Sequence, residues 1–389
     1  MKIGVLTGGG DCPGLNPVIR SVVKTAINEF GFSVTGFKDG FEGVILNNYI
    51  NLDNNSVSGL LSRGGTILGS SNKANPFKFP IPQNDGHVYL DRSPEVIANY
   101  ERLGLDALVV IGGDGTMAAG SGLEELGINM VGVPKTIDND LLGTDQTFGF
   151  DTAVTTATDA IDKIHTTASS HHRVMIVEVM GRYAGWVALA SGVAGGADII
   201  LLPEIPYDLN VICEKIKERN RQGKNFSIVV IGEGAKPEGG SMVISKMVET
   251  SPDAIRLGGI GHQLGAQIEG LTEIETRVTI LGHVIRGGSP TAYDRILGTH
   301  FGREAVHLIA NKQFGRMVVL KGNRFDSVPI KDVAGKVRNV PLDCPLIRSA
   351  KSLGVCLGIS NESLEKPNNP NHQIHENKIN QIEEKEVTA

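Results

Sequence analysis

The sequence predicts an α/β fold in which helices cover both faces of mainly parallel sheets. Short runs rich in Val, Ile and Leu alternate with longer helix-like stretches, which is typical of this class. The runs are almost continuously apolar, as in strands buried on both faces. The 49 glycines spread without a fixed period through the 389 residues, which favours many tight turns over low complexity. A chain of this length has room for two domains.

The predicted elements can be placed in order along the chain. The first strand, at 2–7, runs into a glycine-rich turn at 8–14, and Pro94 stands where proline suits the first turn of a helix. We predict helices over 16–29, 94–103 and 151–166. We predict strands at 2–7, 33–37, 107–111, 130–133, 173–179, 199–202, 227–231, 277–281 and 317–321. Sites in such sheets form at the carboxyl ends of strands.

Charge and composition narrow the classes of partner and compartment. The net charge is -6 and there is no block of basic residues, so a nucleic-acid partner has no electrostatic support. No apolar run is long enough to span a bilayer, and no secretory signal precedes the first strand. The four cysteines form no Cys-x-x-Cys pair and no zinc pattern. We therefore expect a cytoplasmic protein with free thiols, without a nucleic-acid or membrane partner.

The end of the chain differs from the rest in composition. Residues 365–389 are rich in Asn, Glu, Lys and Pro and nearly free of aliphatic side chains. Such a segment cannot bury enough apolar surface to offset the entropy of ordering it. The sequence therefore predicts a disordered tail at 365–389.

Two short strings carry most of the chemical information. Gly-Gly-Asp-Gly-Thr at 112–116 and Pro-Lys-Thr-Ile-Asp-Asn-Asp at 134–140 each follow a predicted strand. A glycine loop after a strand lets backbone N–H groups approach a phosphate. Asp114 can hold the Mg²⁺ that phosphate carries, or it can simply cap the next helix. Asp138 and Asp140 can divide the work, one accepting a hydroxyl proton and the other positioning a sugar, or they can form an Asx-rich turn.

Basic residues recur beside predicted strand ends or glycines. They are Arg173, Arg182, Arg277, His283 and Arg286. A single arginine is more often a surface residue, but several in such places resemble a phosphate clamp. The residues together indicate Mg²⁺-dependent transfer of a phosphoryl group to a phosphorylated hydroxyl compound.

The loop at 8–14, Gly-Gly-Gly-Asp-Cys-Pro-Gly, joins a predicted strand to a predicted helix. It lacks the Gly-Lys-Ser/Thr of a P-loop and the Gly-x-Gly-x-x-Gly of a dinucleotide site. Taken alone, it is as compatible with a tight turn without a ligand as with a phosphate loop. Cys12 has no activating base in the sequence and is a weak candidate for a catalytic thiol.

In their order along the chain, these motifs closely resemble those of the 6-phosphofructokinase family. The resemblance runs from Lys2 to about Ile359. The motifs that carry it are at 6–11, 63–66, 112–116, 136–140, 177–182, 233 and 282–288. It implies two doubly wound α/β domains with the active site in the cleft between them. The larger, nucleotide-binding domain would span 1–137 and about 255–310, and the smaller, sugar-phosphate-binding domain 138–254 and about 311–360.

The resemblance also implies a role for each candidate residue. Asp138 would take the proton from the C1 hydroxyl of fructose 6-phosphate, and Asp114 would bind Mg²⁺. Catalysis would also involve Thr136, Arg182, Gly10 and Lys135. The sugar phosphate would contact Thr136, Asp138, Asp140, Arg173, Met180, Gly181, Arg182, Glu233, Arg277, His283 and Arg286. The nucleotide would contact Gly10, Asn72, Lys73, Gly113, Asp114, Gly115 and Thr116.

The resemblance implies a partner as well as substrates. In the family, Arg173 and Arg277 come from a neighbouring subunit. A homotetramer or homodimer with shared active sites is therefore expected, acting on ATP and fructose 6-phosphate.

The positions that distinguish phosphoryl donors in the family are mixed in this chain. Common bacterial ATP enzymes have Gly at positions 115 and 135, whereas pyrophosphate enzymes have Asp and Lys there. This chain has Gly115 and Lys135. A carboxylate at 115 would repel the α-phosphate of ATP, so Gly115 favours ATP, while Lys135 can neutralise either donor. Asn72 replaces the arginine of the common ATP enzymes, and Lys73 beside it supplies only a point charge.

We expect an ATP-dependent 6-phosphofructokinase that forms fructose 1,6-bisphosphate in glycolysis. The strings at 149–152 and 170–173 are similar to those of the mixed-substrate, actinobacterial-like branch of the family, which contains both donor types. A pyrophosphate-dependent or ADP-using enzyme therefore remains an alternative. A non-catalytic sugar-phosphate sensor is a second alternative, against which the intact Asp114, Asp138 and Arg182 argue.

Overall fold

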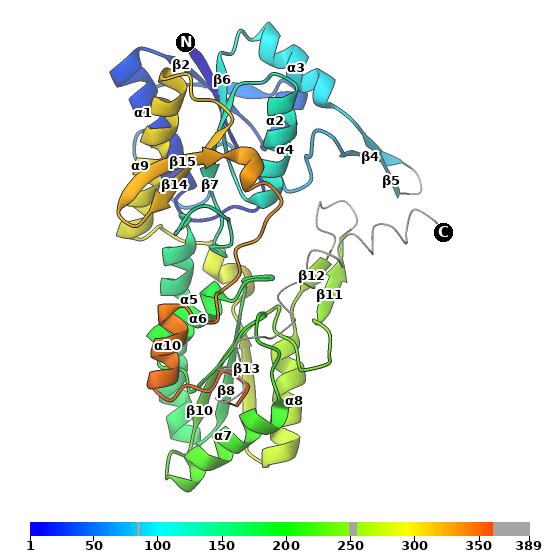
Figure 1. Cartoon of the computed structure of the whole chain (residues 1–389), viewed down its shortest axis with the longest axis vertical. Coiled ribbons are helices and arrows are strands. Elements are labelled where there is room, and N and C mark those ends of the chain that lie inside the picture. The colour runs from blue at the N-terminus through cyan, green and yellow to red at the C-terminus, as the bar shows by residue number, and fades with distance from the viewer. Residues whose placement is uncertain (84–85, 249–254, 361–389) are drawn as a thin grey trace.

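The computed structural model describes residues 1–83, 86–248 and 255–360. These residues form two main sheets, one in each half of the elongated molecule in Figure 1, with helices packed against both. The predicted α/β class is confirmed. The tail expected at 365–389 lies outside the described residues.

The larger sheet occupies the upper half of Figure 1. Its strand order is β15 (Arg324–Pro329), β14 (Arg316–Lys321), β7 (Met130–Pro134), β6 (Ala107–Gly112), β1 (Lys2–Thr7), β2 (Ser33–Phe37) and β3 (Tyr49–Leu52). The five inner strands are parallel, and both edge strands are antiparallel to their neighbours. β1, β6 and β7 are completely buried except for one end of β1, as the continuous apolar runs predict.

The smaller sheet lies in the lower half of the molecule. Its order is β13 (Thr276–Ile280), β8 (Val174–Val179), β10 (Ser227–Gly232) and β9 (Ile199–Leu201), and all its pairs are parallel. β8, β9 and β10 are fully buried. The carboxyl ends of its strands therefore point to one edge, where the chemistry of such sheets is found.

Helices cover both sheets. The larger sheet carries α1 (Leu15–Phe30), α2 (Phe41–Ile45), α3 (Ser93–Arg102), α4 (Asp114–Glu125) and α9 (Ala292–Ala310). The smaller sheet carries α5 (Phe150–His171), α6 (Trp186–Ala194), α7 (Leu209–Arg221), α8 (Ile260–Thr272) and α10 (Pro345–Ser352). The 3-10 turns are η1 (Gly282–Arg286) and η2 (Ile330–Asp332).

Two hairpins were not anticipated from the sequence. They are β4 (Phe79–Gln83) with β5 (Gly86–Leu90), which projects sideways from the upper half, and β11 (Ile244–Met247) with β12 (Ile255–Leu257). β4 contains two prolines and β11 is exposed along its length, so neither shows the buried apolar run that identifies a core strand.

The expected division of the chain is wrong for three strands. Residues 255–310 were assigned to the larger domain, but β13 pairs with β8 in the smaller sheet. Residues 311–360 were assigned to the smaller domain, but β14 pairs with β7 and with β15 in the larger sheet. α9 packs on α1 of the larger half and α10 on α6 of the smaller. Strand pairing joins residues far apart in sequence, so local patterns do not reveal it.

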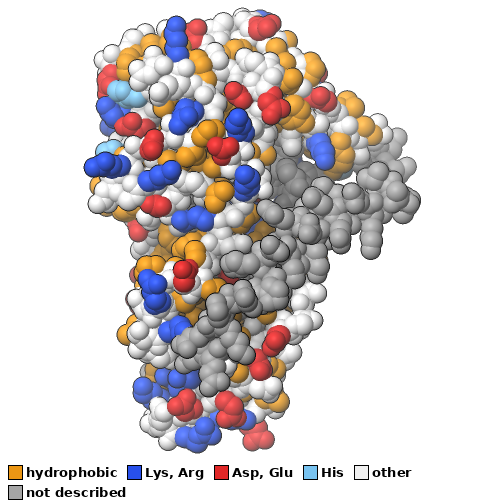
Figure 2. All heavy atoms as spheres, in the orientation of Figure 1, with side chains coloured by type: hydrophobic (Ala, Val, Ile, Leu, Met, Phe, Trp, Pro, Cys, Tyr) orange, Lys and Arg blue, Asp and Glu red, His pale blue; other side chains and the backbone are white. Residues whose placement is uncertain are grey.

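The surface of the visible face is mixed in charge. Figure 2 shows acidic and basic side chains interspersed over both halves, rather than one basic patch. Among the described residues, no helix is long and apolar enough to cross a membrane.

Candidate active site

Most of the candidate residues lie at the carboxyl ends of parallel strands. Gly10 and Asp138 lie in the loops that follow β1 and β7, and Asp114 begins the helix α4 that follows β6. In the smaller sheet, Arg182 follows β8 and Glu233 follows β10. The two edges meet, because Arg286, just after β13, donates from Nη1 to the carbonyl of Asp11 at 3.2 Å. The structure thus brings the motifs that follow strands of the larger sheet next to those that follow strands of the smaller sheet.

The glycine loop after β1 is held from three sides. The N–H of Gly8 donates to Ile111 at 2.8 Å and that of Gly9 to Ser71 at 2.9 Å. A Cβ added to Gly8 would lie 2.8 Å from the Thr116 side chain, and Gly9 has a φ of +78°. Only glycine tolerates these positions without strain or displacement, so the close packing explains the repeated glycines.

Lys135 is hydrogen-bonded to this loop. The side chain is only 4% exposed, and its ammonium donates a hydrogen bond to the carbonyl of Gly10. Burial lowers the pKa of Lys135 below its ordinary value. One of the three N–H donors of the ammonium is therefore used to hold the backbone of the loop.

The turn that carries Asp138 has a left-handed residue at its centre. Asn139 has a φ of 53°, a conformation that Asn tolerates better than most residues. Its Oδ1 accepts from the N–H of Thr147 at 3.0 Å, and the Thr147 hydroxyl donates to the carbonyl of Thr136 at 2.7 Å. The Thr136 hydroxyl accepts from the N–H of Asp138 at 3.0 Å. These bonds fix the directions of Asp138 and Asp140.

Asp138 is a buried carboxylate that is incompletely bonded. It is 9% exposed, and its Oδ1 has no hydrogen-bond partner among the described residues. Burial raises the pKa of Asp138 above its ordinary value, and the charges of Arg286 and Arg182 counteract that rise. A buried acceptor is costly when unpaired. It is therefore suited to accept a hydrogen bond from a ligand hydroxyl.

Two further carboxyl groups line the same space. Burial, followed by the charge of Asp138, raises the pKa of Asp140 to about 7 and that of Glu233 to about 7. Glu233 Oε1 accepts from the N–H of Arg182 at 3.1 Å. Buried acids near a cation and other acids are typical of functional sites.

The loop after β8 has an unusual backbone. Gly181 has a φ of +149°, and a Cβ there would lie 2.7 Å from the carbonyl of Ala184. Arg182 has a φ of 51°, which is uncommon for a residue with a side chain. Met180 is half-buried beside them. Strain of this kind clusters at functional sites, which agrees with the predicted role of the loop.

The predicted nucleotide loop is more open. Gly113 precedes α4, Asp114 and Gly115 are its first residues, and Gly115 is exposed. A Cβ added to Gly115 would meet no atom within 4 Å. Asn72 and Lys73 are also exposed. The surroundings of Gly115 are therefore open enough for a phosphate chain to approach.

The acids also fit Mg²⁺. Burial is the main cause of the raised pKa of both Asp138 and Asp140, and the charge of Asp114 adds to it. Within the part of the chain described, no group of three or more His, Cys, Asp or Glu residues is placed to bind a metal by itself. Mg²⁺ commonly uses one or two carboxylates together with substrate phosphates. Asp114 is a suitable ligand of this type.

Two predicted phosphate contacts lie at the opposite end of the smaller sheet. Arg173 immediately precedes β8, and Arg277 is the second residue of β13. Glu275 joins them, accepting from Arg173 Nε at 2.6 Å and also from Arg277 Nη2. β8 is six residues long, or roughly 20 Å at about 3.3 Å per residue. Within one chain, these arginines therefore do not reach Arg182. By contrast, His283, which is exposed, and Arg286, which is half-buried, lie in η1, at the carboxyl end of β13 where the candidate site is.

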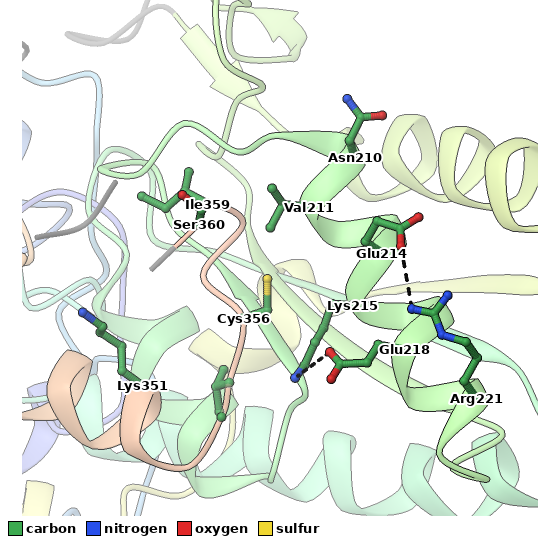
Figure 3. Close-up of a pocket in the computed structure, with 12 residues that line it drawn as sticks. Asn210, Val211, Glu214, Lys215, Glu218, Arg221, Lys351, Cys356, Ile359 and Ser360 are labelled. Carbon is green, nitrogen blue, oxygen red and sulfur yellow. Dashed lines mark ion pairs between the residues drawn. The ribbon is translucent and has the colours of Figure 1, made fainter. Parts of the chain in front are cut away.

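A separate hollow lies away from these residues. Figure 3 shows a cavity of about 530 Å³ between α7 and the chain around 351–360. Lys215 pairs with Glu218 and Arg221 with Glu214 at its rim, each at 3.8 Å. It contains no predicted site residue and mixes both charges.

Sequence reasoning missed two residues that contact predicted site residues, one at each end of the smaller sheet. Glu275 pairs with both distant arginines, and Arg338 donates from its guanidinium to the carbonyl of Asn139. Glu275 could have been suspected from its place beside Arg277. Arg338 belongs to no motif, and its contact joins residues 199 positions apart.

The fold and the site together define an α/β phosphotransferase of the sugar-phosphate kinase type. Residues 2–309 match the family described as Phosphofructokinase. The chain belongs to the phosphofructokinase family, as the motifs predict.

Relatives match over nearly their whole length. The chain is 54% identical over 356 residues to ATP-dependent 6-phosphofructokinase 2 of Clostridium perfringens, covering 91% of this chain and 97% of that protein. It is 50% identical over 359 residues to ATP-dependent 6-phosphofructokinase of Chloroflexus aurantiacus, covering 92% and 98%.

Solved structures agree on the fold. Pichia pastoris phosphofructokinase in the T-state superposes with a TM-score of 0.74 at 30% identity, covering 91% of this chain and 39% of that chain. Pyrophosphate-dependent phosphofructokinase from Nitrosospira multiformis gives a TM-score of 0.75 at 18% identity, covering 92% of each. The second likeness concerns the fold alone.

Proposed function

We propose that the protein is an ATP-dependent 6-phosphofructokinase that phosphorylates the C1 hydroxyl of fructose 6-phosphate in glycolysis. The observation that carries the proposal is the unpartnered buried Oδ1 of Asp138, set between the glycine loops of the larger sheet and the arginines of the smaller sheet. Relatives of 50% identity or more named ATP-dependent 6-phosphofructokinase support the same reaction.

Asp138 acts as the general base. The unpaired Oδ1 of Asp138 accepts the proton of the C1 hydroxyl while the C1 oxygen attacks the γ-phosphorus of ATP. The bond between that phosphorus and ADP breaks, and ADP leaves. The cations of Arg286 and Arg182 favour the ionised carboxylate that this step needs. Arg182 then faces the negative charge of the transferring group, together with Thr136 and the backbone of Gly10.

The sugar phosphate is held by residues of both halves. Asp140, Met180, Gly181 and Glu233 surround the sugar, and His283 and Arg286 meet its 6-phosphate. On the donor side, Gly113, Asp114, Gly115 and Thr116 lie along the nucleotide phosphates with Asn72 and Lys73. When bound at Asp114, Mg²⁺ neutralises charge on the donor phosphates.

ATP is favoured over pyrophosphate by two features of the chain. The space at Gly115 is open, so the α-phosphate meets no carboxylate there. Lys135 donates one hydrogen bond to the carbonyl of Gly10, so it has a structural task in the loop whichever donor is used and does not by itself mark a pyrophosphate site. Lys135 contributes to catalysis by holding the loop against the donor.

The test is formation of fructose 1,6-bisphosphate from fructose 6-phosphate and Mg²⁺, with ATP, ADP and pyrophosphate supplied separately. Turnover with ATP alone is expected. Turnover with pyrophosphate alone would overturn the donor assignment. Binding of fructose 6-phosphate without turnover by any donor would identify a sensor.

We further propose that the active site is shared between copies of this chain in a homodimer or homotetramer. Arg173 and Arg277 lie at the amino end of the smaller sheet, far from Arg182 of their own chain, so within one chain they do not reach the candidate site. A neighbouring copy can present these two arginines to it.

A mixing experiment checks this sharing. Asp138→Asn and Arg173→Ala subunits should each be nearly inactive alone. Refolding them together should restore activity, because some sites then combine an intact Asp138 with a partner's intact arginine. Mixing two batches of Asp138→Asn is the control. If the mixed sample stays as inactive as its components, each site belongs to one chain.

We place this reaction in the cytoplasm. Cys12, Cys213, Cys344 and Cys356 are free thiols, and burial raises the pKa of Cys12 above its ordinary value. Thiols kept reduced and unreactive fit a reducing compartment, where ATP and sugar phosphates are available.

A further inference from the structure

The chain between η2 and α10 crosses from the larger half of the molecule to the smaller. In Figure 1 it is the orange coil that leaves the β15 region and descends to α10. Residues 337–340 of this crossing, here called the strap, touch the loops of both halves that form the candidate site. The strap lies beyond residues 2–309, which are those matched to the family.

On one side, the strap binds the backbone of the Asp138 turn. Val337 forms an isolated antiparallel bridge with Leu141. The N–H of Arg338 donates to the carbonyl of Asp140 at 2.7 Å. The Arg338 guanidinium donates from Nε at 3.2 Å and from Nη2 at 2.9 Å to the carbonyl of Asn139. One arginine thus holds two consecutive carbonyls of the turn.

On its other side, the strap binds the loop that carries Arg182. The Arg338 guanidinium lies 4.4 Å from the ring centroid of Trp186, and Trp186 Nε1 donates to the carbonyl of Arg338 at 2.8 Å. Trp186 is the first residue of α6, four positions after Arg182. Trp186 and Arg338 are therefore held together by two contacts, the stacking of the guanidinium on the indole and the hydrogen bond from the indole to the Arg338 backbone.

Glu204 completes the second attachment. Its Oε1 accepts from the N–H of Val340 at 2.8 Å and from the N–H of Gly185 at 3.0 Å. Burial raises the pKa of Glu204 above its ordinary value. A buried carboxyl thus joins the strap to the residue just before α6.

The geometry of the turn explains why an arginine is needed. Asn139 holds a left-handed conformation, and its carbonyl lies between the two acids assigned to the base and to the sugar. A planar guanidinium can donate two bonds to one carbonyl while stacking on an aromatic ring. A lysine ammonium offers neither the plane nor the stack.

We infer that Arg338 is a positioning residue that sets the Asp138–Asp140 turn against the Arg182 loop, so that the base and the phosphoryl-binding arginine face one substrate. This inference rests on the proposed function. Arg338 acts through the backbone of Asn139 and Asp140 and has no assigned contact with substrate.

The kinetic test is Arg338→Ala in the full-length protein, assayed with fructose 6-phosphate and ATP. We expect kcat to fall about 10²-fold, the loss that a roughly 1 Å misplacement causes. KM for fructose 6-phosphate should rise, because the turn also holds Asp140. KM for ATP should stay unchanged, because the hydrogen bonds of the strap among the described residues go to the Asp138 turn, Trp186 and Glu204 rather than to the donor loops. A loss of stability alone would lower kcat without separating the two KM values.

A spectroscopic test needs no turnover. Trp186 is the single tryptophan of the chain, so its fluorescence reports the Arg338 stack directly. In folded Arg338→Ala the emission maximum should move to longer wavelength, because the indole loses the group that covers it. An unchanged emission spectrum would show that the strap does not depend on Arg338 and would overturn the inference.

Arg316→Ala is the matched control. Arg316 also donates twice to a single residue, to the hydroxyl of Ser327 at 2.6 Å and to its carbonyl at 2.5 Å, but it pairs with Val131 at the amino end of β7. It should leave both KM values and the Trp186 emission unchanged. Equal kinetic changes in Arg316→Ala and Arg338→Ala would overturn the inference.

Two further results must be told apart: a variant that fails to fold, and failure of the proposed function rather than of the inference. If Arg338→Ala does not fold, Trp186→Phe removes the N–H bond to the Arg338 carbonyl and shrinks the ring, while an aromatic face remains beside the guanidinium. Its KM for fructose 6-phosphate should then rise, and an unchanged value would overturn the inference. If the wild-type protein shows no turnover, the proposed function fails; if it is active and Arg338→Ala keeps wild-type kcat and KM, only the inference fails.

Discussion

Replacing Asp138 with asparagine should lower kcat for fructose 6-phosphate phosphorylation by about 10²–10⁴-fold, the usual contribution of a general base. The amide has the size of the carboxylate but cannot take up the C1 proton. The free oxygen of Asp138 has no partner among the described residues, so the substitution breaks no bond of that atom. The rate should therefore fall while fructose 6-phosphate still binds.

Measurements of stability and of substrate binding distinguish a loss of catalysis in Asp138→Asn from a loss of folding. Because burial raises the pKa of Asp138, the neutral amide should be at least as stable in the folded protein as the carboxylate. Thermal unfolding should thus show no loss of Tm, and titration calorimetry should show retained sugar-phosphate binding. Asp326→Asn, on the exposed part of β15, is the control for loss of one negative charge. Wild-type kcat in Asp138→Asn would exclude the assigned base.

Replacing Gly115 with aspartate should lower kcat/KM for ATP by about 10²–10³-fold. A carboxylate about 4 Å from a donor phosphate costs about 4 kcal/mol at an effective dielectric constant near 20, and about 1.4 kcal/mol corresponds to a tenfold change. The fold should be unaffected, since a Cβ at Gly115 meets no atom within 4 Å. An acid in the first turn of α4 also suits the helix dipole.

Gly115→Asn is the matched control, because it adds nearly the same volume without charge. It should retain most of the ATP activity, and the difference between the two variants measures the electrostatic part. Steady-state kinetics with ATP varied at saturating fructose 6-phosphate gives both values. Equal kcat/KM for ATP in Gly115→Asp and wild type would show that the α-phosphate does not pass position 115.

The buried strands were accessible to sequence reasoning because their signal is local. A fully covered strand must be apolar at successive positions, and the runs at 107–111 and 130–133 coincide with β6 and β7 to within one residue. The exposed hairpins β4–β5 and β11–β12 have no such requirement. In each hairpin the two strands pair, among the described residues, only with one another. Such pairing requires no run of apolar residues, so residues 79–90 carry no comparable signal.

For the candidate site, the sequence predicted which residues take part but not how they are paired. Residue types and spacing were enough to select Asp114, Asp138 and Arg182, because phosphoryl transfer restricts which side chains can follow the strands. They could not show which of the acids is left unpaired. That depends on how the turn is buried and on the charges of Arg182 and Arg286, which come from other segments of the chain.

The sequence by itself determined the family, the class of fold and the order of the strand-end motifs. Each of these is written in neighbouring residues, whose apolar runs, glycines and acids have a local physical cause. Only the tertiary structure decided that β13 belongs to the smaller sheet and β14 to the larger, that Lys135 is bonded to Gly10, and that Arg338 holds the turn of Asp138. These features join residues more than a hundred positions apart, and packing of the whole chain selects them from many locally equivalent pairings.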